Sequence, residues 1–463
     1  MKVNATARIG RMPIVADQDG LTGRVGLGLV AQLADRIGLS AALSTAVKGR
    51  TTRRSRVDDG KVLRDLVLML IDGGDAVSDL RALAGQQPLF GEVCSVSTAS
   101  RVVEAIDEDA LERIREARAL VRERAWSLGA APHRVVIDVD ASLVTSHSEK
   151  EGAAPTWKRG FGFHPMRAFC ADTREALGGL LRPGNAGSNT AIDQLVVASE
   201  ALRQLPAGFL AGATAPDAAE ADRIVIRTDS AGAVHEFIDG VRAMGARFSV
   251  GFAIDEVLRS RILAVGNAAW QDAVNTDGEP RDGAWVAELD PPTGWPQDAR
   301  VIVRRERPHP GAQLSFTDAD GHRFQAILTD QHGDIAKLER DHRARGDAEN
   351  RVRNAKDCGM ENLPFRAFAH NEAWLELVLI ALDLVAWTER ILLHDTALAS
   401  AEPKTLRYRL LHVAARITRG PTQGVPAPGR ALALGPRPGQ SVHPPAADPT
   451  PGLTARTTAT QPP

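Results

Sequence analysis

The sequence predicts an α/β protein in which a mixed β-sheet core is preceded by an all-helical segment and interrupted by a β-rich insertion. Three observations predict this class. Apolar residues recur at helical spacing up to about residue 129, and short apolar runs then alternate with helical stretches over 130–254. Acidic residues also punctuate three separate elements, at Asp140, Asp229 and Glu349. Because 463 residues exceed one ordinary core, we expect several folding units.

The first unit, residues 1–129, is expected to be an all-helical N-terminal domain. Its apolar residues, such as Val30, Leu33 and Ile37, return every three or four positions. One helix opens at Ser97 with good N-cap chemistry and a basic residue nearby, which suits a helix that touches DNA. A capped packing helix is the more common meaning of the same pattern.

The second unit, residues 130–254, changes to short strands. Three strand-like runs are followed by a helix, a strand, a helix and a last strand, at residues 135–144, 167–171, 176–181, 190–205, 224–226, 231–244 and 248–254. This order is that of a ribonuclease-H-like α/β core. We therefore expect residues 130–254 to form the first part of such a core.

The rest of the chain divides at changes of pattern. Residues 255–331 are irregular with short strand candidates, which indicates a β-rich insertion. Helical spacing then resumes in 332–419, the expected second part of the core, where the apolar stretch from Trp374 to Trp387 predicts a buried helix too short to span a bilayer. Residues 420–463 are rich in Pro and poor in apolar residues, which predicts a disordered tail.

Composition limits the function only weakly. The net charge of -2 neither supports nor excludes a nucleic-acid partner. The three cysteines, Cys94, Cys170 and Cys358, lack paired metal-ligand spacing and suit a reducing compartment. The N-terminus lacks a long apolar segment followed by a cleavage site. We expect a cytoplasmic protein, located at the bacterial nucleoid if DNA is its partner, with no membrane association.

Acidic residues are the candidate catalytic groups. Asp138 and Asp140 lie two residues apart in an apolar strand, where a carboxylate is costly to bury unless it is paired or binds a cation. We rank Asp140 first, with Asp138 as a supporting or alternate ligand. Asp229 ends a strand, where ligands collect in open α/β sheets, although helix capping is the better explanation when this residue is taken alone. Glu349 is either a ligand or an exposed acid paired with Arg353.

Together these carboxylates are the minimum set for a two-metal reaction. Mg²⁺ prefers carboxylate oxygens, and two ions about 3.5–4 Å apart activate an attacking oxygen while they stabilise the departing one. No general-base histidine is then required. A zinc site is disfavoured because no His or Cys pair has ligand spacing.

The helix around Glu349 resembles that of insertion-sequence transposases with a DDE triad, whose signature is Tyr-x2-Arg-x3-Glu-x6-Lys. Arg345, Glu349 and Lys356 match it at the right spacing, and His342 replaces the tyrosine. Three further stretches are similar to the insertion-sequence thirteen-eighty group, at residues 136–140, 181–186 and 227–230. The resemblance extends from about residue 25 to residue 420.

The resemblance implies a role for each matched residue. Asp140, Asp229 and Glu349 would be the catalytic metal ligands, holding two Mg²⁺ ions that Mn²⁺ can replace. Arg345 and Lys356, with His342 beside them, would contact DNA phosphates, where contacts position a strand without reading its sequence. The insertion would hold a DNA hairpin or a flipped base, for which the candidate stacking residues are Trp270, Trp285 and Trp295.

The implied activity is cut-and-paste transposition of an insertion sequence, with hydrolysis at the element ends followed by strand transfer. The implied partners are double-stranded DNA, as terminal inverted repeats and as target, and a second copy of the chain in a homodimer. The N-terminal domain would bind the repeats and assist dimerisation. Two alternatives remain: a ribonuclease-H-like nuclease without strand transfer, and a non-catalytic or impaired DNA-binding relic that represses the element.

Overall fold

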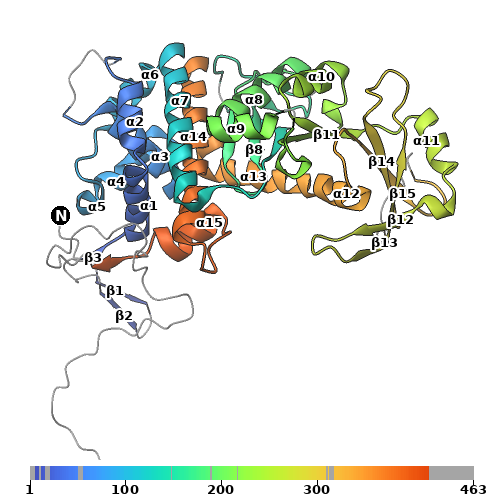
Figure 1. Ribbon diagram of the computed structural model, residues 1–463. Coiled ribbons are helices and arrows are strands. Elements are labelled where there is room, and N and C mark those ends of the chain that lie inside the picture. Colours follow the sequence, from blue (N-terminus) through green and yellow to red (C-terminus); the bar gives the residue numbers. More distant parts are fainter. Residues whose placement is uncertain are drawn as a thin grey trace, which may run out of the picture.

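The computed structural model describes residues 6–9, 12–15, 21–50, 56–147, 149–187, 190–215, 217–308, 311 and 318–416. The N-terminal helices gather on one side of the molecule and the large sheet lies on the other (Figure 1). Helix α14 (Phe368–Trp387) runs beside α7 (Glu108–Ala125) between these two parts (Figure 1). The tail expected at 420–463 lies outside the described residues.

Capping residues set the ends of the N-terminal helices. Asp58 accepts a hydrogen bond from the backbone N of Lys61 at 3.1 Å and begins α3 (Asp59–Asp72). Gly73 ends this helix with a φ of 104°, a left-handed conformation that favours glycine. The other helices of this part are α1 (Val25–Arg36), α2 (Leu39–Ala46), η1 (Val77–Leu80), α4 (Arg81–Ala84), α5 (Gln87–Phe90), α6 (Val96–Glu104), α7 and η2 (Trp126–Ala130).

The N-terminal part is not entirely helical, so the all-helical expectation is wrong before Val25. Strand β1 (Thr6–Ile9) pairs antiparallel with β2 (Met12–Val15), and β3 (Leu21–Thr22) pairs with β16 (Ala415–Arg416). These strands are too short to show any period, which is why helical spacing downstream gave no warning of them. The second pair ties the two ends of the described chain together.

The central sheet is mixed, as predicted, and has nine strands in the order β12-β13-β14-β15-β11-β10-β4-β8-β9. Strand β10 is parallel to both β4 and β11, whereas β8 is antiparallel to both β4 and β9. Their bounds follow the predicted runs closely: β4 (Val136–Ala141), β8 (Met166–Cys170), β9 (Ala176–Leu180), β10 (Val225–Thr228) and β11 (Arg247–Phe252).

Helices cover this part of the sheet. Helix α8 (Ala191–Arg203) packs on β8, β9 and β4, and α10 (His235–Ala243) packs on α8. Helix α9 (Ala207–Thr214) lies in the same group (Figure 1). Two short turns complete the connections, η3 (Glu220–Asp222) and η4 (Ser230–Gly232). The helices place apolar side chains against strands that are themselves buried, so the core is continuous from sheet to helices.

The strands of the expected insertion extend the central sheet. Strand β15 (Arg323–Thr329) pairs antiparallel with β11, and β14 (Arg300–Glu306), β13 (Pro280–Leu289) and β12 (Gln271–Val274) follow it outward. Helix α11 (Glu256–Leu263) and the turn η5 (Asn267–Ala269) lead into these strands. A small apolar cluster holds α12 (Ile335–Arg343) against the outer strands, and it is formed by Ala273, Ala284, Val286, Ile302, Ile327, Ala336 and Leu338.

The last elements return to the helical part. After α12 (Ile335–Arg343) come η6 (Ala344–Asp347), α13 (Ala348–Ala355), η7 (Lys356–Met360), α14, η8 (Thr388–Leu392), α15 (Pro403–Leu406) and η9 (Arg407–Leu411). Helix α14 is buried throughout from Ala373 to Trp387, as the sequence predicts. No single described helix is long and apolar enough to cross a membrane; α1 and α2 qualify only as a pair bent by 61°.

A buried network of charges joins α7 to α14. Arg118 donates to Asp383 at 2.7 Å and to Glu376 at 2.9 Å. Arg122 donates to Asp383 and, at 3.0 Å, to Glu175 before β9. Both guanidinium groups and the Asp383 and Glu175 carboxylates are fully buried. Because each acid meets an arginine, the network fixes the helical part against the sheet.

Candidate functional site

Asp140 and Asp229 lie at the same edge of the sheet. Asp140 is the fifth residue of β4, and Asp229 directly follows β10, which runs parallel to β4. Arg227 of β10 is opposite Asp138 of β4, so the same register continued by two residues sets Asp229 level with Asp140. Neighbouring strands lie about 4.8 Å apart, which keeps the two carboxylates close.

The surroundings of Asp140 are strongly charged. Its side chain is 22% exposed, and the Arg345 guanidinium lies 3.5 Å from its Oδ1. Burial raises the pKa of Asp140, the positive charges of Arg345 and Arg167 oppose this rise, and the negative charge of Asp229 adds to it. The two carboxylates therefore repel each other, which is the condition that a bound cation relieves.

Arg167 is a residue of this site that the sequence did not single out. It is fully buried on β8, directly opposite Asp140 in the antiparallel register. Its Nη2 donates to Ser142 Oγ at 2.6 Å, while its Nε has no partner among the described residues. Burial lowers its pKa to about 10. An arginine within the apolar strand Met166–Cys170 is the signal that identifies it.

Asp138 forms a buried ion pair. Arg227 donates to both of its carboxylate oxygens, from Nε at 2.7 Å and from Nη2 at 2.8 Å. The same arginine also donates to the backbone oxygen of Asp341 on α12. The structure therefore places Asp138 in a link between β4, β10 and α12, with both oxygens already accepting hydrogen bonds.

Asp229 is exposed and acts as a helix N-cap. Its Oδ1 accepts a hydrogen bond from the backbone N of Ala231 at 2.9 Å and begins the turn η4. The capping role anticipated from the sequence is thus present. The cap orients the carboxylate at the strand end, where it acts on Asp140.

Glu349 lies on a helix, whereas the other two acids lie at strand ends. It lies in the first turn of α13 and is exposed. Arg345, in the preceding turn η6, is the residue of this segment that reaches Asp140. Within the described part of the chain, no three His, Cys, Asp or Glu side chains surround a common point where a metal ion would bind. The structure brings Asp140, Asp229 and Arg345 together, and Glu349 lies on the helix that follows Arg345.

The two remaining predicted contacts differ from each other. His342 Nδ1 lies 2.8 Å from Ser249 Oγ of β11, with either atom able to donate, depending on the histidine tautomer. Burial and nearby arginines lower the pKa of His342 to about 3, so its ring is neutral at physiological pH. Lys356 is partly buried at the start of η7 and makes no side-chain hydrogen bond or ion pair with any described residue.

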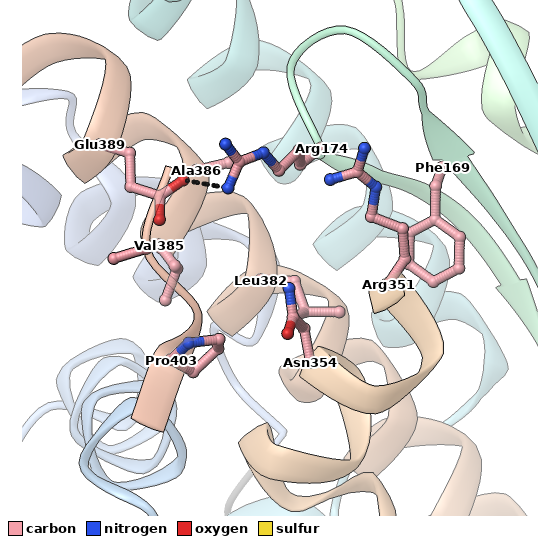
Figure 2. Close-up of a pocket in the computed structure, with 10 residues that line it drawn as sticks. Phe169, Arg174, Arg351, Asn354, Leu382, Val385, Ala386, Glu389 and Pro403 are labelled. Atoms are coloured by element: carbon pink, nitrogen blue, oxygen red, sulfur yellow. Dashed lines mark hydrogen bonds and ion pairs between the residues drawn. The ribbon is translucent and has the colours of Figure 1, made fainter. Parts of the chain in front are cut away.

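The opposite face of α13 is held by a cluster of charges. Figure 2 shows Arg351 of α13 beside Phe169, with Arg174 joined to Glu389 of η8. Arg174 donates to Glu389 Oε2 at 3.3 Å, while Glu389 Oε1 and Asn354 Oδ1 accept nothing from the described residues. Burial raises the pKa of Glu389 to about 8, against the opposing charges of the two arginines. Arg351 also donates to the backbone oxygen of Ala171 at 3.1 Å, which ties α13 to the end of β8.

The three tryptophans proposed to stack on DNA all have ring partners within the protein. Trp295 stacks on His235, with ring centroids 4.2 Å apart. The guanidinium of Arg305 lies 4.4 Å from the Trp270 ring centroid and 5.0 Å from that of Trp285. Each ring is only partly buried. Trp270 and Trp285 therefore pack on Arg305 of β14, and Trp295 packs on α10.

Comparison with known proteins identifies the family. The family model described as transposase DDE domain group 1 matches residues 7–423. Among solved structures the chain is similar to a piggyBac transposase in a cryo-EM synaptic complex with hairpin DNA, with 9% identity, coverage of 82% of this chain and 78% of that chain, and a TM-score of 0.44. No curated protein matches the sequence. Because the family model spans most of its length, this chain belongs to the DDE transposases.

Proposed function

We propose that this transposase moves an insertion sequence by cut-and-paste, hydrolysing phosphodiester bonds at the element ends and joining the freed ends to target DNA. One observation carries the proposal: two acids, Asp140 and Asp229, lie level at the ends of neighbouring parallel strands, in a chain of the DDE family. Ligands collect at this edge in open α/β sheets. The similarity of residues 136–140, 181–186 and 227–230 to the thirteen-eighty group supports an insertion-sequence origin.

We assign the core to the ribonuclease-H-like class. The support is the strand order β9-β8-β4-β10-β11, in which β8 is antiparallel to its two neighbours and β10 is parallel to its own. The proposed division keeps the N-terminal helices at 1–129, the core at 130–254 and 332–419, and the outer strands at 255–331. On this division the helices serve repeat binding and dimerisation.

Divalent cations, with Mg²⁺ first, fit the donor chemistry of this edge. Asp140 and Asp229 repel each other, and carboxylate oxygens are the ligands that Mg²⁺ prefers. We propose that these two acids hold the metal and that Glu349 completes the set when α13 moves toward the sheet. Bound metal would activate the attacking oxygen and stabilise the leaving one. Asp138 supports the strand from its ion pair with Arg227.

DNA phosphates would be contacted by Arg345 and Lys356. Arg345 already lies at the edge beside Asp140, and Lys356 has no partner in the described part of the chain. His342 suits a different role because it is neutral and bonded to Ser249, so it connects α12 to β11 behind Arg345. Phosphate contacts of this kind hold the strand without reading its sequence.

A joint cleavage and joining assay tests the proposal. The full-length protein is incubated with Mg²⁺, a linear fragment bearing both element ends, and a supercoiled target plasmid. We expect cleaved ends and plasmids that have gained the fragment, and neither product in EDTA. Cleavage without joining would instead identify a nuclease. Binding without metal-dependent cleavage would identify a non-catalytic DNA-binding protein, and an absence of binding would overturn the proposal.

A further inference from the structure

A short hairpin leaves the sheet at the edge that carries Asp140 and Asp229. The chain exits β4 at Ala141, forms the three-stranded sheet of β5 (Val144–Thr145), β6 (Ala154–Pro155) and β7 (Phe161–Phe163), and returns as β8. Met166, the first residue of β8, pairs with Ala141. The hairpin therefore starts and ends one residue from Asp140, on the side of the sheet where we propose that DNA is cut.

The tip of this hairpin is a defined turn. Between β6 and β7 the backbone N of Thr156 donates to the oxygen of Gly160 at 2.8 Å, and that of Arg159 donates to the oxygen of Thr156 at 2.9 Å. The backbone N of Gly160 also donates to Thr156 Oγ1 at 3.1 Å. Arg159 adopts a φ of 60°, in the left-handed region. The turn thus gives Trp157, Lys158 and Arg159 a fixed backbone.

The base of the hairpin is anchored on two sides. The backbone N of Glu151 donates to the oxygen of Arg366 at 2.9 Å, and its carboxylate accepts from the backbone N of Phe368 at 2.9 Å. Gly162 of β7 lies so near β5 that a Cβ would come within 2.0 Å of the Val144 oxygen. An anchored base presents the tip without a large loss of chain entropy on binding.

The side chains of Trp157, Lys158 and Arg159 are exposed at the tip. Trp157 is 67% exposed, in contrast to Trp270, Trp285 and Trp295, which are partly buried against other rings. Lys158 Nζ lies 4.9 Å from the Trp157 ring centroid. Lys158 and Arg159 are exposed and form no ion pair with any described residue. One exposed apolar residue is ordinary, but an exposed indole followed directly by two exposed cations offers a stacking surface for a base and positive charge for adjacent phosphates.

The tip also lies within reach of a cleaved strand. Arg167 is opposite Asp140, and ten residues separate it from Trp157, a chain length of at most about 36 Å. At about 3.4 Å per nucleotide of one strand, this distance is at most about ten base pairs. A duplex that extends about ten base pairs from a scissile phosphate at Asp140 is therefore long enough to reach the hairpin tip.

We propose that Trp157, Lys158 and Arg159 form a DNA-binding tip, in which the indole stacks on an unpaired base near the cleavage site and the two cations contact adjacent phosphates. The proposal rests on the transposase function proposed above. Stacking on an indole tolerates any base, since every base has a π-face. The DNA strand is either the element end or the target, which share this chemistry.

Binding of labelled DNA tests the tip. Fluorescence anisotropy is measured in Ca²⁺ on full-length protein with a pre-nicked duplex of the element end and with a nicked duplex of unrelated sequence. We expect Trp157→Ala to weaken binding by roughly 10-fold and Trp157→Phe to restore most of it. The double variant K158Q/R159Q should reduce the slope of log affinity against log salt by about 2. Ile192→Ala, which truncates an exposed side chain on α8, should change nothing.

A second readout reports stacking directly. 2-Aminopurine placed at successive positions beside the nick should be quenched at one position by the wild type and not by Trp157→Ala. If Trp157→Ala loses quenching on the element-end duplex, the tip contacts the transposon strand. If it loses quenching on the unrelated duplex, the tip contacts the target strand. Equal affinity and equal quenching for wild type and Trp157→Ala would show that the tip does not bind DNA. Cleavage by the wild type in the same preparation would still support the proposed function. A wild type that binds neither duplex overturns both.

Discussion

Charged side chains gather in two regions of this transposase, and the regions differ in how the charges are matched. Between α7 and α14, Arg118 and Arg122 are fully buried and each is bonded to buried carboxylates, with Asp383 shared by both. At the sheet edge, Asp140 is partly exposed, has Arg345 at 3.5 Å, and is repelled by Asp229. One region neutralises its charge and the other leaves it incompletely compensated.

The difference separates charges that are matched within the protein from charges that remain available to a ligand. A buried charge that already has its partner offers nothing to a ligand, and its removal leaves another charge unpaired. Carboxylates that repel each other at an open edge gain from a cation, and perturbed acids of this kind cluster at functional sites. Residue type alone does not distinguish the two regions, because both contain Asp and Arg.

Asp229→Asn tests the sheet edge, and we expect it to have the largest effect of these variants. The amide retains an oxygen for the Ala231 cap but loses the negative charge, so end cleavage in Mg²⁺ should fall by about 1,000-fold while the melting temperature changes little. Glu349→Gln should act in the same direction. The measurement is the rate of end cleavage together with thermal unfolding.

A matched control for Asp229→Asn is Asp255→Asn. Asp255 caps α11 in the same manner, accepting from the backbone N of Leu258 at 2.7 Å, and it lies in the loop between β11 and α11. This variant should cleave at the wild-type rate. If Asp229→Asn also cleaved near the wild-type rate, Asp229 would have no part in catalysis and would be a cap alone.

Asp383→Ala tests the buried network between α7 and α14. It should lower the free energy of unfolding by about 3–5 kcal/mol, because it leaves Arg118 and Arg122 buried without their shared carboxylate. The measurement is the midpoint of urea unfolding followed by circular dichroism. Asp298→Ala removes an exposed partner of Arg242 and should cost less than about 1 kcal/mol. Equal midpoints for the two variants would show that the buried network contributes no more than a surface pair.

Much of the sheet is predictable from the sequence because its strands are short apolar runs bounded by polar turns. The predicted runs at 167–171 and 176–181 lie within one residue of β8 and β9 at each end. What could not be predicted is long-range pairing. Strand β15 joins β11 across more than seventy residues of sequence, and no local pattern encodes that contact.

The site shows the same division between local and long-range information. Asp138 and Asp140 have the same pattern in the sequence, and only the register with β10, which brings Arg227 to Asp138, separates them. The break of the helix at η6 sets where Glu349 lies relative to the edge, and helical spacing does not reveal such a break. The exposure of Trp157 could not be predicted from the sequence, because this residue lies in a turn and belongs to no periodic element.

Arg345→Gln tests the coupling of Arg345 to Asp140, and we expect an intermediate effect on cleavage. The positive charge of Arg345 lowers the pKa of Asp140, so its removal raises that pKa further and shifts the acidic limb of the cleavage profile to higher pH. The loss of one phosphate contact should also reduce the salt slope of DNA binding by about 1. The measurements are cleavage rate against pH and anisotropy against KCl. An unchanged acidic limb would contradict the coupling of Arg345 to Asp140.

Glu389→Gln should have the smallest effect, and it tests the charged cluster beside α13. This cluster is intermediate between the two regions, because one carboxylate oxygen of Glu389 accepts a hydrogen bond from Arg174 and the other has no partner among the described residues. The folded pKa of Glu389 is raised from 4.5 to about 8. Between these values the folded state keeps a proton that the unfolded state has released, so stability falls as pH rises through this window. Below pH 4.5 and above pH 8 the group adds no slope.

The variant should therefore remove a pH dependence while preserving the neutral form of the side chain. Near neutrality the wild type should lose up to about 1 kcal/mol of stability per pH unit relative to Glu389→Gln, read from paired unfolding midpoints. Glu402→Gln, an exposed partner of Arg353, is the control and should follow the wild type. A difference between wild type and Glu389→Gln that stays constant from pH 5 to pH 8 would mean that Glu389 is ionised in the folded state. The cluster on α13 would then belong with the matched charges of the α7–α14 network.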